Sequence, residues 1–377
     1  MQVTASMDIL YYAEDPGAAN YVVHLPGACE KKGFSWKAIC GEKAKSIFDT
    51  HGVSSVMEKA FAFSKEALEA FGPRLVVTGT SENPKSFGLS LLSEARKKGI
   101  PSIGAVDAFS NARFRFRGLV DDPLAFAPDW LLVPDPWTLQ AYTHLGFPEE
   151  KIFVCGHPQY DFVRAKADEL EGRGKETIRT LFFPKAMAQQ VIAVFAAEQP
   201  GGLNPEQYLK TESYTLDGRG GTSRNEIVLE EFLDAMALLQ QKPYLVLRLP
   251  PKAEPEDFSA YLKEFHMVSR REPVLELVFG SDCVFGMSSM LLVEALLLGK
   301  PTFSILPREV ERDWLPSLRA GLTPCATTRD DLRRFLPIFI GDLKSFSPKN
   351  LTSHFIFGSR EKAVAAIEDV VRNLPKA

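Results

Sequence analysis

The sequence contains no run of about twenty consecutive apolar residues, the length that an α-helix needs to span a bilayer. It also lacks a basic N-terminal flank followed by an apolar stretch, which is the arrangement of a secretory signal. Together these absences predict a cytoplasmic protein without a transmembrane segment. Apolar residues make up 45% of the 377 residues and charged residues 24%, so the chain can build both a large core and a solvated surface.

Cysteine is scarce as well, with 5 residues in the chain and no C-x-x-C pair. The odd number and the wide scatter argue against a disulfide framework and against a structural zinc site. Cys40, Cys155 and Cys283 lie in apolar runs and are expected to be small buried hydrophobes in a reducing compartment. The histidines other than His157 show no metal-ligand spacing, so no metal is predicted.

Charge of one sign does not dominate, since the formal net charge is -4. This value excludes a global attraction to nucleic acid or to anionic membranes, and no nucleic-acid partner is predicted. A local basic patch remains at Arg113, Arg115 and Arg117. These arginines could hold a phosphate-bearing acceptor. They could equally form one solvated face of an extended segment, which is the interpretation we favour.

Short apolar runs alternate with amphipathic stretches along the whole chain, and the series occurs twice. This pattern predicts an α/β fold with two Rossmann-like units, each a parallel sheet covered by helices on both faces. Predicted helices include Tyr21–Lys32, Ser64–Phe71, Lys85–Lys98 and Ser359–Asn373. The predicted strands are Asp8–Ala13, Trp36–Cys40, Leu75–Thr78, Ser102–Val106, Trp130–Val133, Ile152–Cys155, Val191–Ala196, Tyr244–Leu247, Asp282–Phe285 and Thr302–Ile305.

The predicted domains are residues 1–163 and residues 181–356, each Rossmann-like. The charged segment Arg164–Thr180 between them is expected to be a linker or a connecting helix. Residues 357–377 are expected to form a C-terminal helix that could pack back on the first domain. Gly201–Gly221 is polar and rich in glycine and threonine, so we expect a mobile loop or an insertion.

Ligands bind parallel sheets of this kind at the carboxyl ends of the strands, so the loops there are the functional candidates. After the first strand, Gly17 would let a ligand approach the backbone, Asp15 could accept a proton from a hydroxyl, and Asn20 could cap the next helix. A tight turn with a capping residue explains this loop equally well. The loop is not a G-x-G-x-x-G fingerprint, which argues against NAD.

Three later strand ends in the first half carry further candidates. Gly79 and Thr80 suit sugar or phosphate oxygens, although Thr80 could instead cap a helix. Asp107 follows the strand at Ser102–Val106 and is a candidate general base. His157 follows the sixth strand, where it could act as a general acid or base, bind a diphosphate as a cation, or be structural.

In the second half, the stretch from Gly286 to Pro301 leads from a strand through a polar turn into a helix. Ser288 or Ser289 would lie at the helix N-terminus, where unpaired backbone N–H groups and the helix dipole favour an anion such as a diphosphate. The alternative is that the serines only cap the helix.

Three more residues of the second half are candidates for the same donor site. Glu294, two turns along, could accept the two hydroxyls of a ribose. Arg248 at a strand end could contact a phosphate or form a salt bridge, and Gln199 could line the site.

Taken together, these motifs resemble the GT-B superfamily, in the branch of the non-hydrolysing UDP-N-acetylglucosamine 2-epimerases and the CDP-glycerol glycerophosphotransferases. The similarity lies in motif order across nearly the whole chain. Val77-Thr-Gly-Thr-Ser81 resembles the epimerase segment V-x-G-D-T without its aspartate. Gly156-His-Pro-Gln-Tyr-Asp161 resembles G-N-T-x-x-D, and Ser288 to Pro301 is similar to S-G-G-L-Q-E-E-A-P-x-L-G-K-P.

The departures from the family pattern narrow what the resemblance implies. Epimerases carry H-R-R-E-N where this chain has Glu198-Gln-Pro-Gly-Gly202, and Val293 replaces the first of the paired family glutamates. The resemblance therefore implies a GT-B fold, two Rossmann-like domains with parallel sheets facing across a cleft, and a nucleotide-sugar-dependent glycosyltransferase that needs no metal or other cofactor.

The expected partners of such an enzyme are a nucleotide sugar and a glycan or small-molecule acceptor, for glycan or surface-polysaccharide synthesis. A homodimer is compatible with this expectation. A sugar-nucleotide 2-epimerase and a non-catalytic nucleotide-sugar-binding protein are the alternatives.

Overall fold

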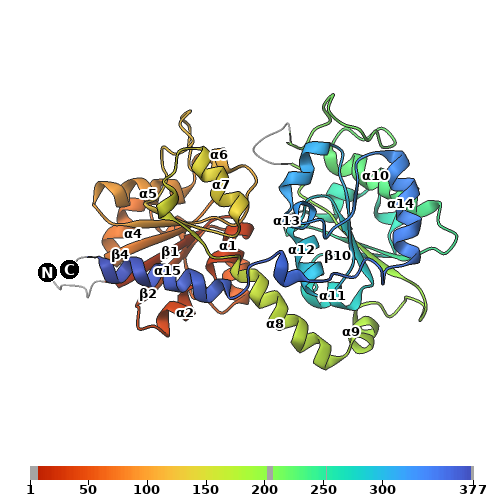
Figure 1. Ribbon diagram of the computed structural model, residues 1–377, viewed down its shortest axis with the longest axis horizontal. Coiled ribbons are helices and arrows are strands. Elements are labelled where there is room, and N and C mark those ends of the chain that lie inside the picture. The colour runs from red at the N-terminus through yellow and green to blue at the C-terminus, as the bar shows by residue number, and fades with distance from the viewer. Residues whose placement is uncertain (1–6, 202–206, 252, 375–377) are drawn as a thin grey trace. The chain divides into compact units, whose positions relative to one another are not determined.

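The computed structural model describes residues 7–201, 207–251 and 253–374, so part of the predicted loop Gly201–Gly221 lies outside the described residues. The chain forms two compact units, drawn in Figure 1. Unit 1 comprises Met1–Asp161 and Phe355–Ala377, and unit 2 comprises Phe162–His354. Each unit contains one parallel β-sheet in its described part.

The sheet of unit 1 has the strand order β3-β2-β1-β4-β5-β6-β7, and every neighbouring pair is parallel. The order reverses between β1 and β4, which is the topological switch point of a doubly wound fold. The strands are β1 Met7–Ala13, β2 Trp36–Cys40, β3 Val56–Met57, β4 Pro73–Gly79, β5 Ser102–Ala105, β6 Trp130–Val133 and β7 Ile152–Val154.

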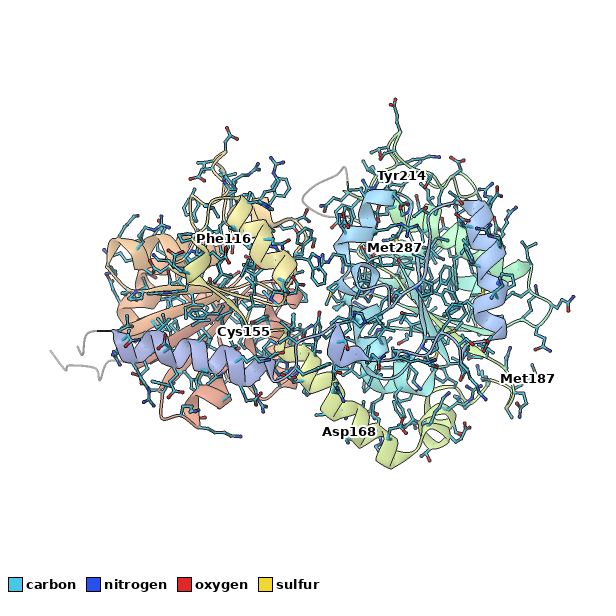
Figure 2. All side chains as sticks on the ribbon, viewed as in Figure 1. Phe116, Cys155, Asp168, Met187, Tyr214 and Met287 are labelled. Atoms are coloured by element: carbon cyan, nitrogen blue, oxygen red, sulfur yellow. The ribbon has the colours of Figure 1, made fainter. Side chains whose placement is uncertain are left out.

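The first strand is apolar throughout because both of its faces are covered. Ile9 and Tyr11 lie in the core on one face of the sheet, while Leu10 and Tyr12 lie in the core on the other face. This arrangement explains a continuous apolar run where a strand with one solvated face would alternate. Side chains fill both layers, with Cys155 and Phe116 in two different cores of this unit (Figure 2).

The helices of unit 1 correct two predictions. The predicted helix Tyr21–Lys32 is wrong, because Pro16 and Pro26 each begin a separate helix at its first position, where proline is favoured. The segment around Arg115 is helical rather than extended. The helices are α1 Pro16–Val22, α2 Pro26–Glu30, α3 Lys45–Thr50, α4 Ser64–Phe71, α5 Phe87–Lys97, α6 Ala112–Arg115, α7 Pro136–His144 and α15 Ser359–Asn373, with 3₁₀ turns η1 Glu58–Ala60 and η2 Glu149–Lys151.

Helix α15 comes from the far end of the chain and lies along the sheet of unit 1 (Figure 1). Its apolar residues Ala363, Ile367 and Val370 are buried in the same core as β1. The carboxylate of Asp161 accepts hydrogen bonds from the first backbone N–H groups of this helix, at Gly358 (2.9 Å), Ser359 (2.6 Å) and Arg360 (3.1 Å). Asp161 thus satisfies donors that the helix itself leaves unpaired.

The sheet of unit 2 repeats the same plan, with the order β10-β9-β8-β11-β12-β13 and parallel pairing throughout its described strands. Its switch point lies between β8 and β11. The predicted α/β fold class with two parallel sheets is therefore confirmed. The strands are β8 Ile192–Ala196, β9 Tyr244–Arg248, β10 Met267–Ser269, β11 Cys283–Gly286, β12 Thr302–Ile305 and β13 Cys325–Ala326.

Aromatic rings fill much of the core of unit 2. Phe232 of α10 contacts Phe195 of β8 and Phe285 of β11 at ring-centroid distances of 4.8 and 5.1 Å. The helices are α8 Pro158–Arg173, which begins in unit 1, α9 Lys175–Phe182, α10 Arg224–Ala237, α11 Val274–Gly280, α12 Met290–Leu297, α13 Pro316–Arg319 and α14 Arg329–Gly341. The 3₁₀ turns are η4 Pro255–Phe258, η5 Leu262–Glu264, η6 Glu309–Trp314 and η7 Leu351–Ser353.

The predictions about cysteine burial and about membrane-spanning segments can be compared with these elements. The cysteines predicted to be buried, Cys40, Cys155 and Cys283, are buried and free. Within the described ranges, no helix combines the length and the apolar character that crossing a membrane requires.

Replacing Asp161 with alanine should destabilise unit 1 by about 1–3 kcal/mol, because three backbone donors of α15 lose a charged acceptor. Urea unfolding followed by circular dichroism measures this loss. Asp161→Asn keeps an acceptor without the charge and should lose less. Asp369→Ala, at an exposed position near the other end of α15, is the matched control and should stay within about 0.5 kcal/mol. Equal losses for the two alanine variants would contradict the role of Asp161.

Candidate functional site

The carboxyl edge of the unit 2 sheet brings two loops together at its switch point. Glu198 lies two residues beyond β8, and Ser288 lies two residues beyond β11. The two strands are adjacent and pair up to Ala196 and Gly286, so the loops leave the sheet side by side. This position is where doubly wound sheets bind ligands.

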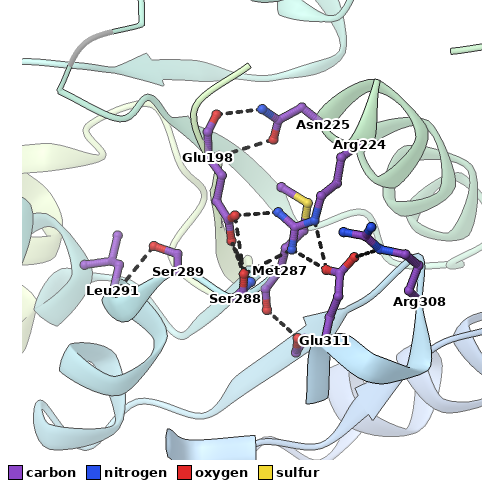
Figure 3. Close-up of polar contacts among 10 residues, drawn as sticks. Glu198, Arg224, Asn225, Met287, Ser288, Ser289, Leu291, Arg308 and Glu311 are labelled. Atoms are coloured by element: carbon purple, nitrogen blue, oxygen red, sulfur yellow. Dashed lines mark hydrogen bonds and ion pairs between the residues drawn. The ribbon is translucent and has the colours of Figure 1, made fainter. Parts of the chain in front are cut away.

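Ser288 and Glu198 are joined directly. The backbone N–H of Ser288 donates to Oε1 of Glu198 at 2.6 Å, and the Ser288 hydroxyl donates to the same oxygen at 3.2 Å (Figure 3). Ser289 has a different role, since it is the N-cap of α12 and its hydroxyl accepts from the N–H of Leu291 at 3.3 Å. Of the two predicted anion contacts, Ser288 therefore already binds a carboxylate, and Ser289 caps the helix.

Arg224 completes this cluster from the first position of α10. One of its terminal nitrogens donates to Oε2 of Glu198 at 2.5 Å, and the other donates to the Ser288 hydroxyl at 3.0 Å. The helix starts here because Ser223 and Glu226 form a capping box that fixes its first turn. Arg224 is 4% exposed, so its charge has little contact with water.

The charge of Arg224 is maintained by two carboxylates. Burial alone lowers the pKa of a guanidinium, but Glu198 and Glu311 together raise the pKa of Arg224 above its usual value. Glu311 is fully buried, accepts from Nε of Arg224 at 2.8 Å, and accepts from Nε of Arg308 at 2.7 Å. The centroid of the Trp314 ring lies 5.5 Å from the guanidinium carbon of Arg224 and 5.3 Å from that of Arg308.

The other predicted donor residues are Arg248, Glu294 and Gln199. Arg248 ends β9, beside Ala196 of β8, and donates to Ser269 at 2.8 Å and to the carbonyl of Glu272 at 3.0 Å. Burial lowers its pKa. Glu294 is partly exposed on α12, and Gln199 is partly exposed beside Glu198. The structure therefore brings Ser288 together with Glu198 and Arg224, whereas Arg248 faces the loop after β10.

A second polar cluster lies at the carboxyl edge of the unit 1 sheet. Oδ1 of Asp107 accepts from the Thr80 hydroxyl at 3.1 Å and from Arg115 at 2.6 Å, and Arg115 also donates to Thr80 at 2.7 Å. Arg115 is 6% exposed, so the expected solvated face is wrong for this arginine. The carboxylate of Asp107, 2.6 Å from the Arg115 guanidinium, offsets the cost of burying this charge.

Gly17 at the start of α1 lies against this second cluster. A Cβ at Gly17 would stand 2.2 Å from Oδ2 of Asp107, so only glycine allows the carboxylate to come this close. Gly79 has a packing role, since a Cβ there would stand 2.6 Å from the Cβ of Ala18 in α1. The two glycines thus let α1 lie close to β4 and to Asp107.

Asp15 lies at the N-cap of α1 and makes its contacts elsewhere. Its side chain forms no cap hydrogen bond, accepts from the Ser81 hydroxyl at 2.6 Å, and lies 3.8 Å from the ammonium group of Lys43. Its side chain is 32% exposed, against 16% for Asp107. Asn20 lies within α1, so the prediction that it caps the next helix is wrong, because the helix begins earlier at Pro16.

His157 is buried at the start of α8, between aromatic rings. Its ring lies 5.0 Å from that of Tyr21 and stacks on Tyr160 at 5.1 Å. Nδ1 accepts the backbone N–H of Gln159 at 3.2 Å, so the neutral ring carries its proton on Nε2. Burial lowers the pKa of His157 to about 4, although Asp107 opposes this shift. At neutral pH the ring is therefore uncharged, which does not suit a cationic role.

No protein-family profile and no curated protein matches this sequence. Solved structures match it in fold. A UDP-GlcNAc 2-epimerase from Neisseria meningitidis bound to UDP-GlcNAc has a TM-score of 0.69 and 13% identity, over 97% of this chain and 100% of that one. One from Methanocaldococcus jannaschii, in complex with UDP-GlcNAc and UDP, has a TM-score of 0.67 and 14% identity over the same shares.

A variant of the wall teichoic acid polymerase TagF matches with a TM-score of 0.55 and 15% identity, over 97% of this chain and 89% of that one. The chain has the GT-B fold. The GT-B fold that the sequence resemblance predicted is thereby confirmed.

Sequence reasoning missed the residues that organise both clusters of this GT-B chain. Neither Arg224 nor Glu311 lies at the end of a predicted strand, so the strand-end pattern does not indicate them. Arg115 was considered only for phosphate binding or as a solvated side chain. The capping-box pattern Ser223 to Glu226 was a usable signal for the start of α10. Within the described residues, no three histidine, cysteine or acidic side chains are grouped to hold a metal ion.

The buried neutral form of His157 predicts a stability loss in acid. Its pKa is about 4 in the folded chain and 6.5 without burial, so the unfolded chain binds more protons between these values. Unfolding free energy should therefore fall as pH drops from 6.5 towards 4, with about 1–3 kcal/mol from this residue. His157→Gln should remove that part of the pH dependence in urea titrations. A His157 ring resonance that titrates near pH 6.5 by NMR would contradict the prediction.

Proposed function

We propose that the protein is a nucleotide-sugar-dependent GT-B glycosyltransferase that transfers a glycosyl group to an acceptor hydroxyl without a metal. Glycan or surface-polysaccharide synthesis is the proposed setting. In this proposal, unit 2 binds the donor nucleotide sugar and unit 1 binds the acceptor. The GT-B fold supports a nucleotide-sugar ligand, as do the UDP and UDP-GlcNAc named for proteins of the same fold.

One observation carries the proposal. At the switch point of unit 2, a backbone N–H, a serine hydroxyl and a buried guanidinium all donate to one carboxylate, that of Glu198. These donor types, placed just before a helix N-terminus, are those that bind phosphate oxygens in proteins. The cluster formed by Ser288 and Arg224 therefore has the chemistry to bind the diphosphate of a donor.

The same groups would assist the departure of the nucleoside diphosphate. Negative charge grows on the leaving diphosphate as the glycosidic bond to it breaks, and fixed donors stabilise that charge best when they are already in place. Arg224 is held in place by the buried Glu311. Arg224 thus replaces Arg248 as the proposed phosphate contact, because Arg224 donates to Ser288 at the switch point, whereas Arg248 donates to Ser269 and Glu272. Glu294, on the partly exposed side of α12, remains the proposed ribose acceptor.

In unit 1 we propose Asp15 as the base that deprotonates the acceptor hydroxyl. Its carboxylate is the more exposed of the two candidates, and Ser81 orients it. Asp107 is bound by Arg115 and Thr80, which suits a group that positions its neighbours rather than one that takes up a proton. Thr80, Gly17, Gly79 and Asn20 remain proposed acceptor contacts.

The donor proposal predicts that a nucleoside diphosphate stabilises the protein. In a thermal-shift panel of UDP-, CDP-, GDP- and CMP-linked sugars, the sugars linked to one nucleotide should raise the melting temperature of the protein, because a ligand that binds the folded state stabilises it. Arg224→Lys keeps the charge but loses the forked donor geometry, so it should weaken that ligand by roughly tenfold. Arg334→Lys at an exposed position is the matched control. No shift with any panel member would contradict the proposal.

The same protein should not epimerise its donor. Incubation with UDP-N-acetylglucosamine without an acceptor should leave the sugar unchanged by NMR, since the epimerase H-R-R-E-N segment is replaced here. Appearance of the 2-epimer would overturn the transferase in favour of an epimerase.

The catalytic proposal predicts different results for the two carboxylates. With the donor found in the panel and a set of simple sugars and polyols as acceptors, Asp15→Asn should lower kcat by about 10²–10⁴-fold at an unchanged melting temperature. Asp107→Asn should lower the melting temperature as well, because buried Arg115 loses its ionised partner. Full transfer activity in Asp15→Asn would place the base elsewhere.

A further inference from the structure

We propose that the Glu198 carboxylate competes with the donor diphosphate for the same hydrogen-bond donors, and so weakens the binding of the nucleoside diphosphate product. This inference rests on the proposed function, because it concerns the same cluster in unit 2. It assigns to Glu198 a role in tuning affinity and product release.

The competition follows from the contacts of Glu198. Its Oε1 accepts from the backbone N–H and the hydroxyl of Ser288, at 2.6 and 3.2 Å, and its Oε2 accepts from Arg224 at 2.5 Å (Figure 3). These are the donors that we assign to the diphosphate. A hydrogen of the Ser288 backbone or of Arg224 that is bound by a carboxylate oxygen at these distances is not available to a phosphate oxygen.

The charges of the cluster point the same way. Two arginines, Arg224 and Arg308, are matched by two glutamates, Glu198 and Glu311, so the cluster is neutral as it stands. A diphosphate brought beside Glu198 would meet a like charge at close range, which is strongly unfavourable where little water screens it. If the Glu198 side chain turns away, the remaining cluster is cationic and attracts the diphosphate.

The Glu198 side chain is the member of the cluster that can rotate away from Arg224 and Ser288. The Glu311 side chain is fully buried and holds two arginines, whereas the Glu198 side chain is 20% exposed. The Glu198 backbone is fixed by Asn225, whose side-chain amide donates to the Glu198 carbonyl at 2.7 Å and accepts its N–H at 3.3 Å. Only the side chain needs to rotate, while Glu311 and Arg308 keep Arg224 aligned.

The consequence for turnover concerns the product. A nucleoside diphosphate keeps the phosphate contacts of the donor, so tight phosphate binding would slow its release, and release limits the rate of many enzymes. A carboxylate that returns to Ser288 and Arg224 lowers the affinity for the product. Glu198 would thus lower affinity and keep the cluster ordered at the same time.

The test is Glu198→Gln, which keeps the shape and removes the charge. Isothermal titration with UDP, CDP, GDP and ADP should show a Kd about tenfold lower than that of the unmodified protein for the diphosphate that binds. Without nucleotide, the variant should melt about 3 °C lower, because Arg224 loses one ionised partner. Tighter binding together with lower stability is a combination that a purely structural glutamate would not produce.

Glu309→Gln is the matched control, since it removes the same charge from an exposed position two residues from Glu311. Its affinity should be unchanged, which separates local competition from net charge. If Glu198→Gln binds the diphosphate as well as or less well than the unmodified protein, the competition is refuted and the donor site stands. If neither protein binds any of the four diphosphates, the donor site itself is wrong and the competition falls with it.

Discussion

The buried guanidinium of Arg224 is the interaction on which the carboxyl edge of the unit 2 sheet depends. It joins the loop after β8 to the loop after β11 through Glu198 and Ser288, and it joins both to η6 through Glu311. A buried charge without partners costs several kcal/mol, so Arg224 favours an arrangement in which these three segments stay together. The electrostatic requirement of one side chain thereby orders a loop region that the sheet alone would leave unspecified.

In unit 1, too, a buried arginine joins two loops at the carboxyl edge of the sheet. There Arg115 is buried against Asp107 and Thr80, which again are a carboxylate and a hydroxyl from the ends of neighbouring strands. In both units the arginine comes from a short segment or a helix start beyond the sheet rather than from a strand. The parallel topology brings loops of one edge together, and a buried ion pair then decides how those loops meet.

Most strands could be predicted because both faces of each sheet are covered, which makes the strands continuous apolar runs. The strands that were missed, β3, β10 and β13, have two or three residues, lie at or near sheet edges, and carry too little apolar sequence to be recognised. The contacts within the candidate site were harder to predict than the strands. Glu198, Arg224 and Ser288 are far apart in the chain, and only the strand order brings them together. Sequence reasoning could locate strand-end loops, but it could not identify a partner that enters from the first turn of a later helix.

The return of α15 to unit 1 has a consequence for synthesis. The core that contains β1 also contains apolar residues of α15, and Asp161 accepts hydrogen bonds from the start of that helix. In the sequence, all of unit 2 lies between Asp161 and α15. While the chain emerges from the ribosome, unit 1 therefore keeps an open apolar face until the last helix arrives, although unit 2 can already be complete. Unit 1, which begins first in the sequence, is therefore completed after unit 2 has been synthesised, when α15 docks onto a sheet whose strands are already present.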